Sequence, residues 1–120
     1  MLTTEETIKI VVAALEDIKA SDITIIDTSK LSSMFERIVV ASANSPRQTR
    51  ALASHVVQQI KLRNTPVLST EGEDSGEWVL VDLGQVVVHI MQPAVRAYYR
   101  LEELWDKQYT PRIPKPPGMA

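Results

Sequence analysis

The sequence predicts a single domain of the α/β class, in which amphipathic helices alternate with short buried strands. Apolar residues recur at helical spacing in residues 3–20 and again in residues 46–63, which is the period of a helix with one face in a core. Between and after these segments come short runs rich in Val and Ile, which are typical of buried strands. The chain has 120 residues, 44% of them hydrophobic. This length suffices to bury one core without disulfides or a metal.

The first helix begins with a capping box and is followed by two strands. Thr3 can cap the first turn, and Glu6 can bind back to the capping residue. The apolar positions of this helix, which runs to about residue 20, are Ile8, Val11, Val12, Leu15 and Ile18. A β-branched run at residues 23–27 predicts the first strand, and residues 37–42 predict the second strand after a polar connection.

A second helix start follows the second strand. Ser45 can cap, Pro46 suits the first helical position, and Gln48 can complete a second capping box. The apolar positions that continue this helix to about residue 63 are Leu52, Ala53, Val56, Val57 and Ile60. Residues 66–69 then predict a short strand, and residues 71–76 predict an exposed acidic loop.

Residues 78–91 predict an antiparallel hairpin, in which Gly84 and Gln85 form the turn. A glycine at the first turn position suits a two-residue type II′ turn. This turn sets the register, and strand alternation then sorts the side chains onto two faces. One face is wholly apolar and is predicted to be core: Val79, Val81, Leu83, Val86, Val88 and Ile90. The other face, which we call the mixed face, consists of Trp78, Leu80, Asp82, Val87, His89 and Met91.

The mixed face is predicted to be a contact surface rather than a wall of the core. It carries one acid and one imidazole among apolar side chains, a mixture that makes a poor core wall and suits an interface. Trp78 is accordingly predicted to anchor a partner, because large rigid aromatic side chains dominate binding hot spots.

Pro93 follows the hairpin and predicts the start of a last helix. The residues that follow its helical period are Val95, Tyr98, Tyr99, Glu102 and Trp105. We predict that Tyr99 and Trp105 fill the core against the sheet. After Asp106, prolines recur at short intervals, which is incompatible with a helix or a central strand. The sequence therefore predicts a domain over residues 1–106 and a flexible, mildly basic tail over residues 107–120.

The composition and the motifs exclude several classes of site. The chain has no cysteine, so disulfides, thiolate nucleophiles and Cys-rich zinc sites are absent. His55 and His89, its two imidazoles, lie in no recognisable nucleophile motif, and the acids of residues 71–76 lack the spacing of a calcium loop. The loop before Ser45 lacks the glycine and lysine of a phosphate-binding loop. We predict no catalytic residue, no metal site and no cofactor.

The charge balance limits the kind of partner. The 13 Lys and Arg against 15 Asp and Glu give a formal charge of −2, without the basic excess of a protein that grips phosphates broadly. A protein surface is therefore the expected contact, and Lys107, Arg112 and Lys115 allow a minor contact with RNA. The acidic start and the lack of a long apolar run predict neither export nor membrane insertion, so we expect a cytoplasmic protein.

Five segments of the chain together match the pattern of a known family: ALEDIKASDI at residues 14–23, ASANSPRQ at 41–48, GEWVLVDLG at 76–84, VVVHI at 86–90 and the ending RAYYRLEELW at 96–105. With these segments the chain resembles the ribosomal silencing factor family, which is also called Iojap-like. They stand in the family's order and spacing, and the resemblance covers residues 8–105.

The resemblance implies an α/β fold with a mixed sheet, similar to nucleotidyltransferases but without their activity. It also implies binding to ribosomal protein fourteen of the large subunit, on the face that meets the small subunit, and a block of subunit joining when nutrients are scarce. The family's Glu-Trp-Val-Leu-x-Asp motif falls on residues 77–82 and is followed by Gly84. With the mixed face, this implies a partner-binding set of Glu77, Trp78, Leu80, Asp82, Gly84, His89 and Met91.

The chain departs from the family pattern at two places, and two other functions stay open. Glu36-Arg37-Ile38 replaces the usual Asp-Tyr-Phe, and Ala43 replaces a glycine, so no partner contact is expected near Glu36. One alternative is a nucleotidyltransferase-like enzyme, suggested by fold analogy alone. That enzyme requires a Gly-Ser loop followed by paired acids, which this sequence lacks. The other alternative is a homodimeric interaction module that uses a sheet face or edge.

Overall fold

A five-stranded mixed sheet forms the centre of the structure, a computed structural model that describes residues 2–30 and 33–100. The elements are α1 Thr4–Asp17, β1 Ser21–Asp27, β2 Arg37–Ser42, α2 Pro46–Lys61, β3 Ser69–Glu71, β4 Trp78–Asp82, β5 Val86–Met91 and α3 Pro93–Tyr99. The strand order across the described sheet is β1-β2-β5-β4-β3. β2 and β5 pair in parallel, and the other three pairs are antiparallel. The α/β class and the mixed sheet expected from the sequence are therefore confirmed.

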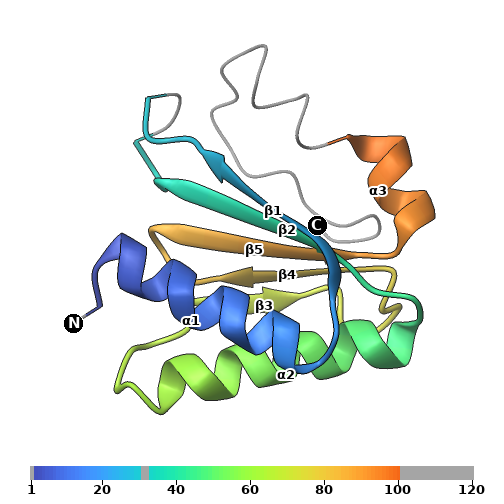
Figure 1. Ribbon diagram of the computed structural model, residues 1–120, viewed down its shortest axis with the longest axis horizontal. Coiled ribbons are helices and arrows are strands. Elements are labelled where there is room, and N and C mark those ends of the chain that lie inside the picture. The colour runs from blue at the N-terminus through green and yellow to red at the C-terminus, as the bar shows by residue number, and fades with distance from the viewer. Residues whose placement is uncertain (1, 31–32, 101–120) are drawn as a thin grey trace.

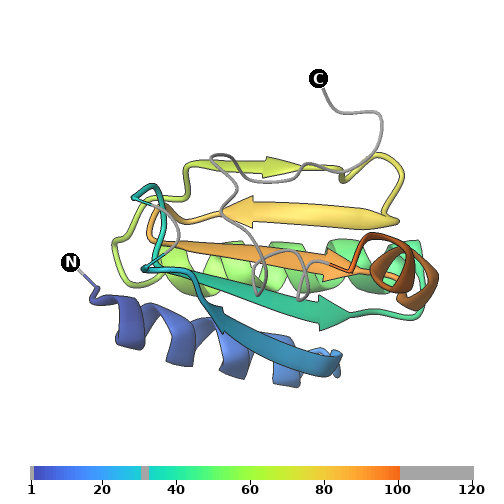
Figure 2. The same ribbon diagram turned by 90° about the horizontal axis from the view of Figure 1, so that it is seen from above.

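Two helices cover one face of this sheet. α1 and α2 lie side by side on it, whereas α3 lies at one end of the opposite face (Figure 1, Figure 2). The helix residues in the core beneath α1 and α2 are Val11, Ala14, Leu15, Leu52, Ala53, Val56 and Ile60. The hairpin residues in the same core are Val79, Val81, Val86, Val88 and Ile90, with Leu83 partly buried against them. The predicted apolar face of the hairpin is thus confirmed as core.

α1 begins with the predicted capping box. The Thr3 hydroxyl accepts a hydrogen bond from the Glu6 amide (3.1 Å), and the Glu6 carboxylate accepts one from the Thr3 amide (2.9 Å). The bond from the Thr3 backbone is the main reason that the pKa of Glu6 lies below its usual value. The helix ends at Asp17, earlier than predicted, and the left-handed backbone of Lys19 (φ 63°) leads into β1, which begins at Ser21.

α2 begins at Pro46 as predicted, but the second capping box is not formed. The Ser45 hydroxyl accepts from the Gln48 amide (3.1 Å) as expected. The Gln48 side chain, however, accepts from the Asn44 amide (2.7 Å) and donates to the carbonyls of Ile18 and Lys19 (both 3.1 Å). Ile18 is the C-cap residue of α1 and Lys19 follows it, so Gln48 donates to the carbonyls of the two residues just after this helix. This side chain therefore joins the end of α1 to the start of α2.

The third strand lies further along the chain than predicted. The sequence predicts it at residues 66–69, whereas β3 is Ser69–Glu71 and pairs with the end of β4. Proline at position 66 has no amide hydrogen to donate, and the first bond of this pairing runs from the Leu68 amide to the Asp82 carbonyl (2.9 Å). β4 thus determines where the strand begins, and Glu71 belongs to the strand rather than to the acidic loop.

The hairpin of β4 and β5 forms in the predicted register. The Leu83 amide donates to the Val86 carbonyl (2.9 Å), which closes the two-residue turn. Gly84, the first turn residue, has a positive φ of 91°, as a type II′ turn requires. A side chain at this position would be strained whatever space surrounds it.

α3 begins at Pro93 as predicted and ends at Tyr99, where Arg100 turns left-handed (φ 49°). The predicted helix positions Glu102 and Trp105 lie outside the described residues, and so does the predicted tail over residues 107–120. Within the described part of the chain, no helix is long and apolar enough to cross a membrane.

Val81→Asp is expected to unfold the domain. Val81 is fully buried beneath the helices, and an unpaired carboxylate there costs several kcal/mol, which is comparable with the whole stability of a small domain. Circular dichroism during thermal unfolding measures the effect. Leu68→Asp is the matched control, because Leu68 is 64% exposed and should accept the same charge with little loss. A folded Val81→Asp protein would contradict the assignment of this face.

Candidate partner-binding surface

The mixed face of the hairpin is continuous across two paired strands. The register places Trp78 beside Met91, Leu80 beside His89, and Asp82 beside Val87. β2 lies on the other side of β5 in parallel and adds apolar side chains to the same face. The structure therefore brings the predicted residues of β4 and β5 together in one sheet surface.

The mixed face is buried, which contradicts the prediction that it is a poor wall for a core. It belongs to a second apolar cluster made of Ile26, Phe35, Ile38, Val40, Trp78, Leu80, Val87 and Met91, with Val95 packed against it. Trp78 is only 1% exposed, and His89 and Met91 are 0% exposed. Trp78 is therefore not a surface anchor. The sequence pattern did not reveal that the indole of Trp78 and the imidazole of His89 can form a hydrogen bond with each other.

A hydrogen bond between Trp78 and His89 makes burial of the imidazole possible. The indole Nε1 of Trp78 donates to Nδ1 of His89 at 2.9 Å, and the ring centroids lie 5.7 Å apart. Because Nδ1 accepts, the hydrogen of the neutral imidazole sits on Nε2. Nε2 is buried and has no hydrogen-bond partner among the described residues. Burial lowers the pKa of His89 to about 3, so the ring is neutral at physiological pH.

Three members of the predicted partner-binding set reach the surface. Glu77 is exposed, and Asp82 and Gly84 are half-buried. The Asp82 carboxylate accepts a hydrogen bond from the Gly84 amide (2.8 Å) and so braces the turn. The other four members, Trp78, Leu80, His89 and Met91, are buried. A partner that approaches the folded domain therefore meets carboxylates at the two ends of β4 rather than the apolar side chains between them.

Two exposed tyrosines lie next to this face, and one of them, Tyr99, was predicted to be buried. Tyr99, predicted to fill the core, is 41% exposed, and Tyr98 is 80% exposed. The Tyr99 ring lies 4.8 Å from the Trp78 ring and 4.9 Å from the Tyr98 ring, measured between centroids. The helical period alone did not reveal this exposure, because Tyr98 and Tyr99 both fit that period.

Arg96 fastens α3 to the edge of the sheet. Its guanidinium donates to the Asp22 carbonyl (2.5 Å), the Ser42 hydroxyl (2.9 Å) and the Thr24 hydroxyl (2.9 Å). These partners belong to β1 and β2, so one side chain ties three elements together.

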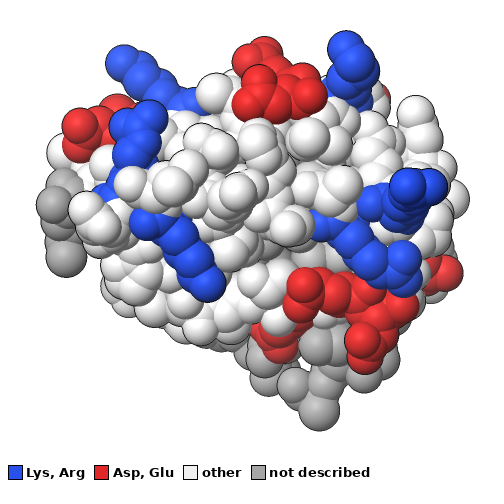
Figure 3. All heavy atoms as spheres, turned by 90° about the horizontal axis from the view of Figure 1, so that it is seen from below, with Lys and Arg blue, Asp and Glu red and all other residues white. Residues whose placement is uncertain are grey.

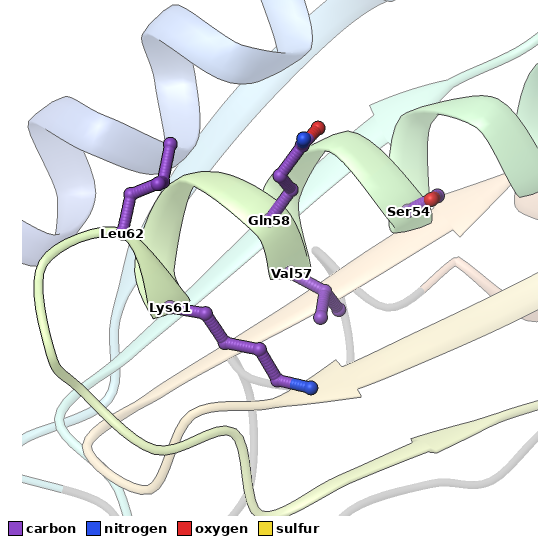
Figure 4. A pocket seen from close by; sticks show the side chains of 5 residues that line it. All are labelled: Ser54, Val57, Gln58, Lys61 and Leu62. Carbon is purple, nitrogen blue, oxygen red and sulfur yellow. The ribbon is translucent and has the colours of Figure 1, made fainter.

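The helix side of the molecule offers no convergent site. Charged side chains lie mainly around its margin (Figure 3), and α2 carries no charge between Arg50 and Lys61. A shallow groove along α2 is lined by Ser54, Val57, Gln58, Lys61 and Leu62. Val57 and Lys61 project on one side of the helix and Gln58 and Leu62 on the other (Figure 4), so these side chains do not meet at one point.

The loop before α2 and the acidic loop are engaged in contacts within the protein. The amides of Asn44 and Gln48 at the start of α2 bind side-chain oxygens, which fits helix capping rather than anion binding. Arg50 donates to the carbonyls of Glu73 and Asp74 (2.7 and 2.8 Å) and holds the acidic loop against α2. Within residues 2–30 and 33–100, no three His, Cys, Asp or Glu side chains are grouped to hold a metal ion.

Comparison with known proteins gives a consistent match. The sequence model of the family described as "Ribosomal silencing factor during starvation" matches residues 1–119. The chain is 52% identical over 104 residues to "Ribosomal silencing factor RsfS" of Chromobacterium violaceum, which covers 87% of this chain and 85% of that protein. It is also 33% identical over 101 residues to the mouse "Mitochondrial assembly of ribosomal large subunit protein 1", covering 82% of this chain and 44% of that protein.

A solved structure has the same fold. A crystal structure of a protein from Chromobacterium violaceum superposes with a TM-score of 0.86 at 46% identity and covers 98% of this chain and 97% of that chain. The structural match and the family match therefore both extend over most of the chain rather than over a single motif.

The buried imidazole is expected to make the domain sensitive to acid. Burial lowers the pKa of His89 from its usual 6.5 to about 3, so between these pH values the unfolded chain binds a proton that the folded chain does not. The contribution of this shift to the free energy of unfolding is complete above pH 6.5. It is lost as the pH falls toward 3, by about 4–5 kcal/mol at most. Urea unfolding at several pH values measures this. His89→Phe should be less stable at neutral pH but show a shallower loss in acid; parallel pH profiles would contradict the assignment.

Proposed function

The chain belongs to the ribosomal silencing factor family, and we propose from this premise that it represses translation by occupying the large ribosomal subunit. It binds ribosomal protein fourteen of that subunit and sterically blocks association with the small subunit under nutrient limitation. The family match over residues 1–119, whose description names starvation, carries the proposal. The name of the mouse relative, which refers to the large subunit, supports the choice of subunit.

The proposed action requires occupancy and no chemistry. A bound domain excludes the second subunit by its volume, so turnover, a metal and a cofactor have no role. Relatives carry the name of a regulatory factor rather than that of an enzyme, which supports a non-enzymatic role. The ribosomal partner places this action in the cytoplasm.

The reachable carboxylates of the hairpin suit a basic protein partner. Glu77 is exposed and Asp82 is half-buried at the other end of β4. We infer that they pair with basic groups of the ribosomal protein. Charges at an interface contribute mainly to orientation, selectivity and the association rate. The formal charge of −2 also favours a basic protein over nucleic acid.

Co-sedimentation with separated ribosomal subunits tests the function. The protein should pellet with large subunits and not with small subunits, and added protein should lower the yield of joined ribosomes in a sucrose gradient. Pelleting with neither subunit would refute the proposal, whatever the details of the surface.

Removing single charges tests the surface. Asp82→Asn removes the charge and keeps an oxygen that accepts the Gly84 amide. Glu77→Gln removes the charge at an exposed position. Each should weaken binding several-fold and reduce its dependence on salt. Glu16→Gln on α1, exposed and distant from the hairpin, is the control with the same change in charge. Binding equal to that of the control would show that the partner contacts another surface.

A further inference from the structure

We propose that Tyr98 and Tyr99 of α3 form the exposed aromatic anchor through which the domain grips a basic protein surface of the large subunit. The inference rests on the proposed function, since it names the residues that contact the same partner. It also supplies what the buried Trp78 cannot, which is a large apolar side chain at the surface of the folded domain.

The two rings are presented to solvent. Tyr98 has the largest exposed fraction of the large hydrophobic side chains in the described residues, at 80%. The two rings pack edge to face, with centroids 4.9 Å apart and an interplanar angle of 71°, a preferred geometry for aromatic pairs. Tyrosine is enriched in binding hot spots because it buries a large area with few rotatable bonds.

α3 is held in place by polar contacts together with the packing of half-buried Val95 against the apolar cluster of the mixed face. It has seven residues, none of them buried, and a helix of this length is unstable alone. The guanidinium of Arg96 supplies the attachment, with its bonds to β1 and β2. The tyrosines are thereby positioned before any partner arrives, which lowers the entropy lost on binding.

The aromatic pair is continuous with the hairpin. The Tyr99 ring lies 4.8 Å from the Trp78 ring, and Trp78 in turn is fixed by its bond to His89. The buried rings therefore support the exposed rings from below. This gives Trp78 an indirect part in binding without contact with the partner.

The charges around α3 favour a basic protein as the partner that contacts the two tyrosines. The Glu77 carbonyl accepts from the amide of Gln92 (3.0 Å), the capping residue of α3, so exposed Glu77 lies at the start of this helix. Aromatic faces attract Lys and Arg side chains, and a nearby carboxylate strengthens this attraction. RNA phosphates would be repelled by Glu77 and by the formal charge of −2. The basic groups of α3 are already engaged in part, Arg96 by the sheet and Arg100 by the Ala97 carbonyl (3.2 Å).

The first test removes one exposed ring. Tyr98→Ala should weaken binding to large subunits by about tenfold to a hundredfold, with an unchanged circular dichroism spectrum because the side chain is 80% exposed. Tyr98→Phe keeps the ring and should bind within about threefold of the wild type. Leu68→Ala, at a 64% exposed position beside β3, is the matched control for loss of an exposed apolar side chain.

The second test concerns Arg96 as a positioning residue. If Arg96 acts through the tyrosines, the effects of Arg96→Gln and Tyr98→Ala on affinity should be far from additive in a double-mutant cycle. Additive losses would show that Arg96 serves general stability only and would overturn its positioning role.

The outcomes separate this inference from the function itself. If the wild type does not pellet with large subunits, the proposed function fails first. If the wild type and Leu68→Ala bind and Tyr98→Ala binds equally well, the function stands and the anchor is wrong. Isolated ribosomal protein fourteen is the probe for the partner class. If Tyr98→Ala weakens binding to subunits but not to this protein, the rings contact another component of the subunit, and ribosomal protein fourteen is the wrong partner for the anchor.

Discussion

The register between β4 and β5 is the constraint on which both cores of this domain depend. Because side chains alternate along a strand, this single pairing sends Val81 toward α1 and α2 and Leu80 toward the opposite face. A shift by one residue would exchange the two sets and place His89 beneath the helices. The turn at Gly84 and the parallel pairing of β5 with β2 hold the register from two directions. α3 follows β5 directly, so its position at the end of the mixed face depends on the same register.

Burial of the mixed face depends on the bond between Trp78 and His89. Each ring carries a polar nitrogen that would be costly to bury alone, and the bond satisfies one nitrogen of each. The remaining nitrogen, Nε2 of His89, has no partner and keeps a residual cost of about 1–3 kcal/mol. The face is therefore stable as a core wall only while the imidazole stays neutral. This explains how a family motif that looks like a surface on the sequence lies inside the folded domain.

The features predicted correctly are those that local sequence determines. The capping box at Thr3, the helix start at Pro46 and the Gly84 turn each depend on residues within a few positions of one another. The failures depend on distant partners. β3 begins where β4 offers a pairing edge, and the mixed face belongs to a buried cluster that also contains Ile26 of β1 and Ile38 and Val40 of β2. In the predicted site, a partner can reach the carboxylates of Glu77 and Asp82, whereas the apolar side chains are buried. The alternation of residues along a strand does not distinguish the exposed members from the buried ones.

A factor that acts by exclusion must stay bound long enough to keep the other subunit away, and this favours a rigid surface. Dissociation rates within related complexes depend chiefly on a few well-positioned anchors, and charges at the rim mainly guide the encounter. In the proposed binding mode, neighbouring elements divide these tasks. Glu77 and Asp82 carry charge at the ends of β4, while α3 holds two tyrosines that Arg96 and Trp78 have already ordered. Because the supports of α3 are fixed by the sheet, little ordering remains to oppose binding.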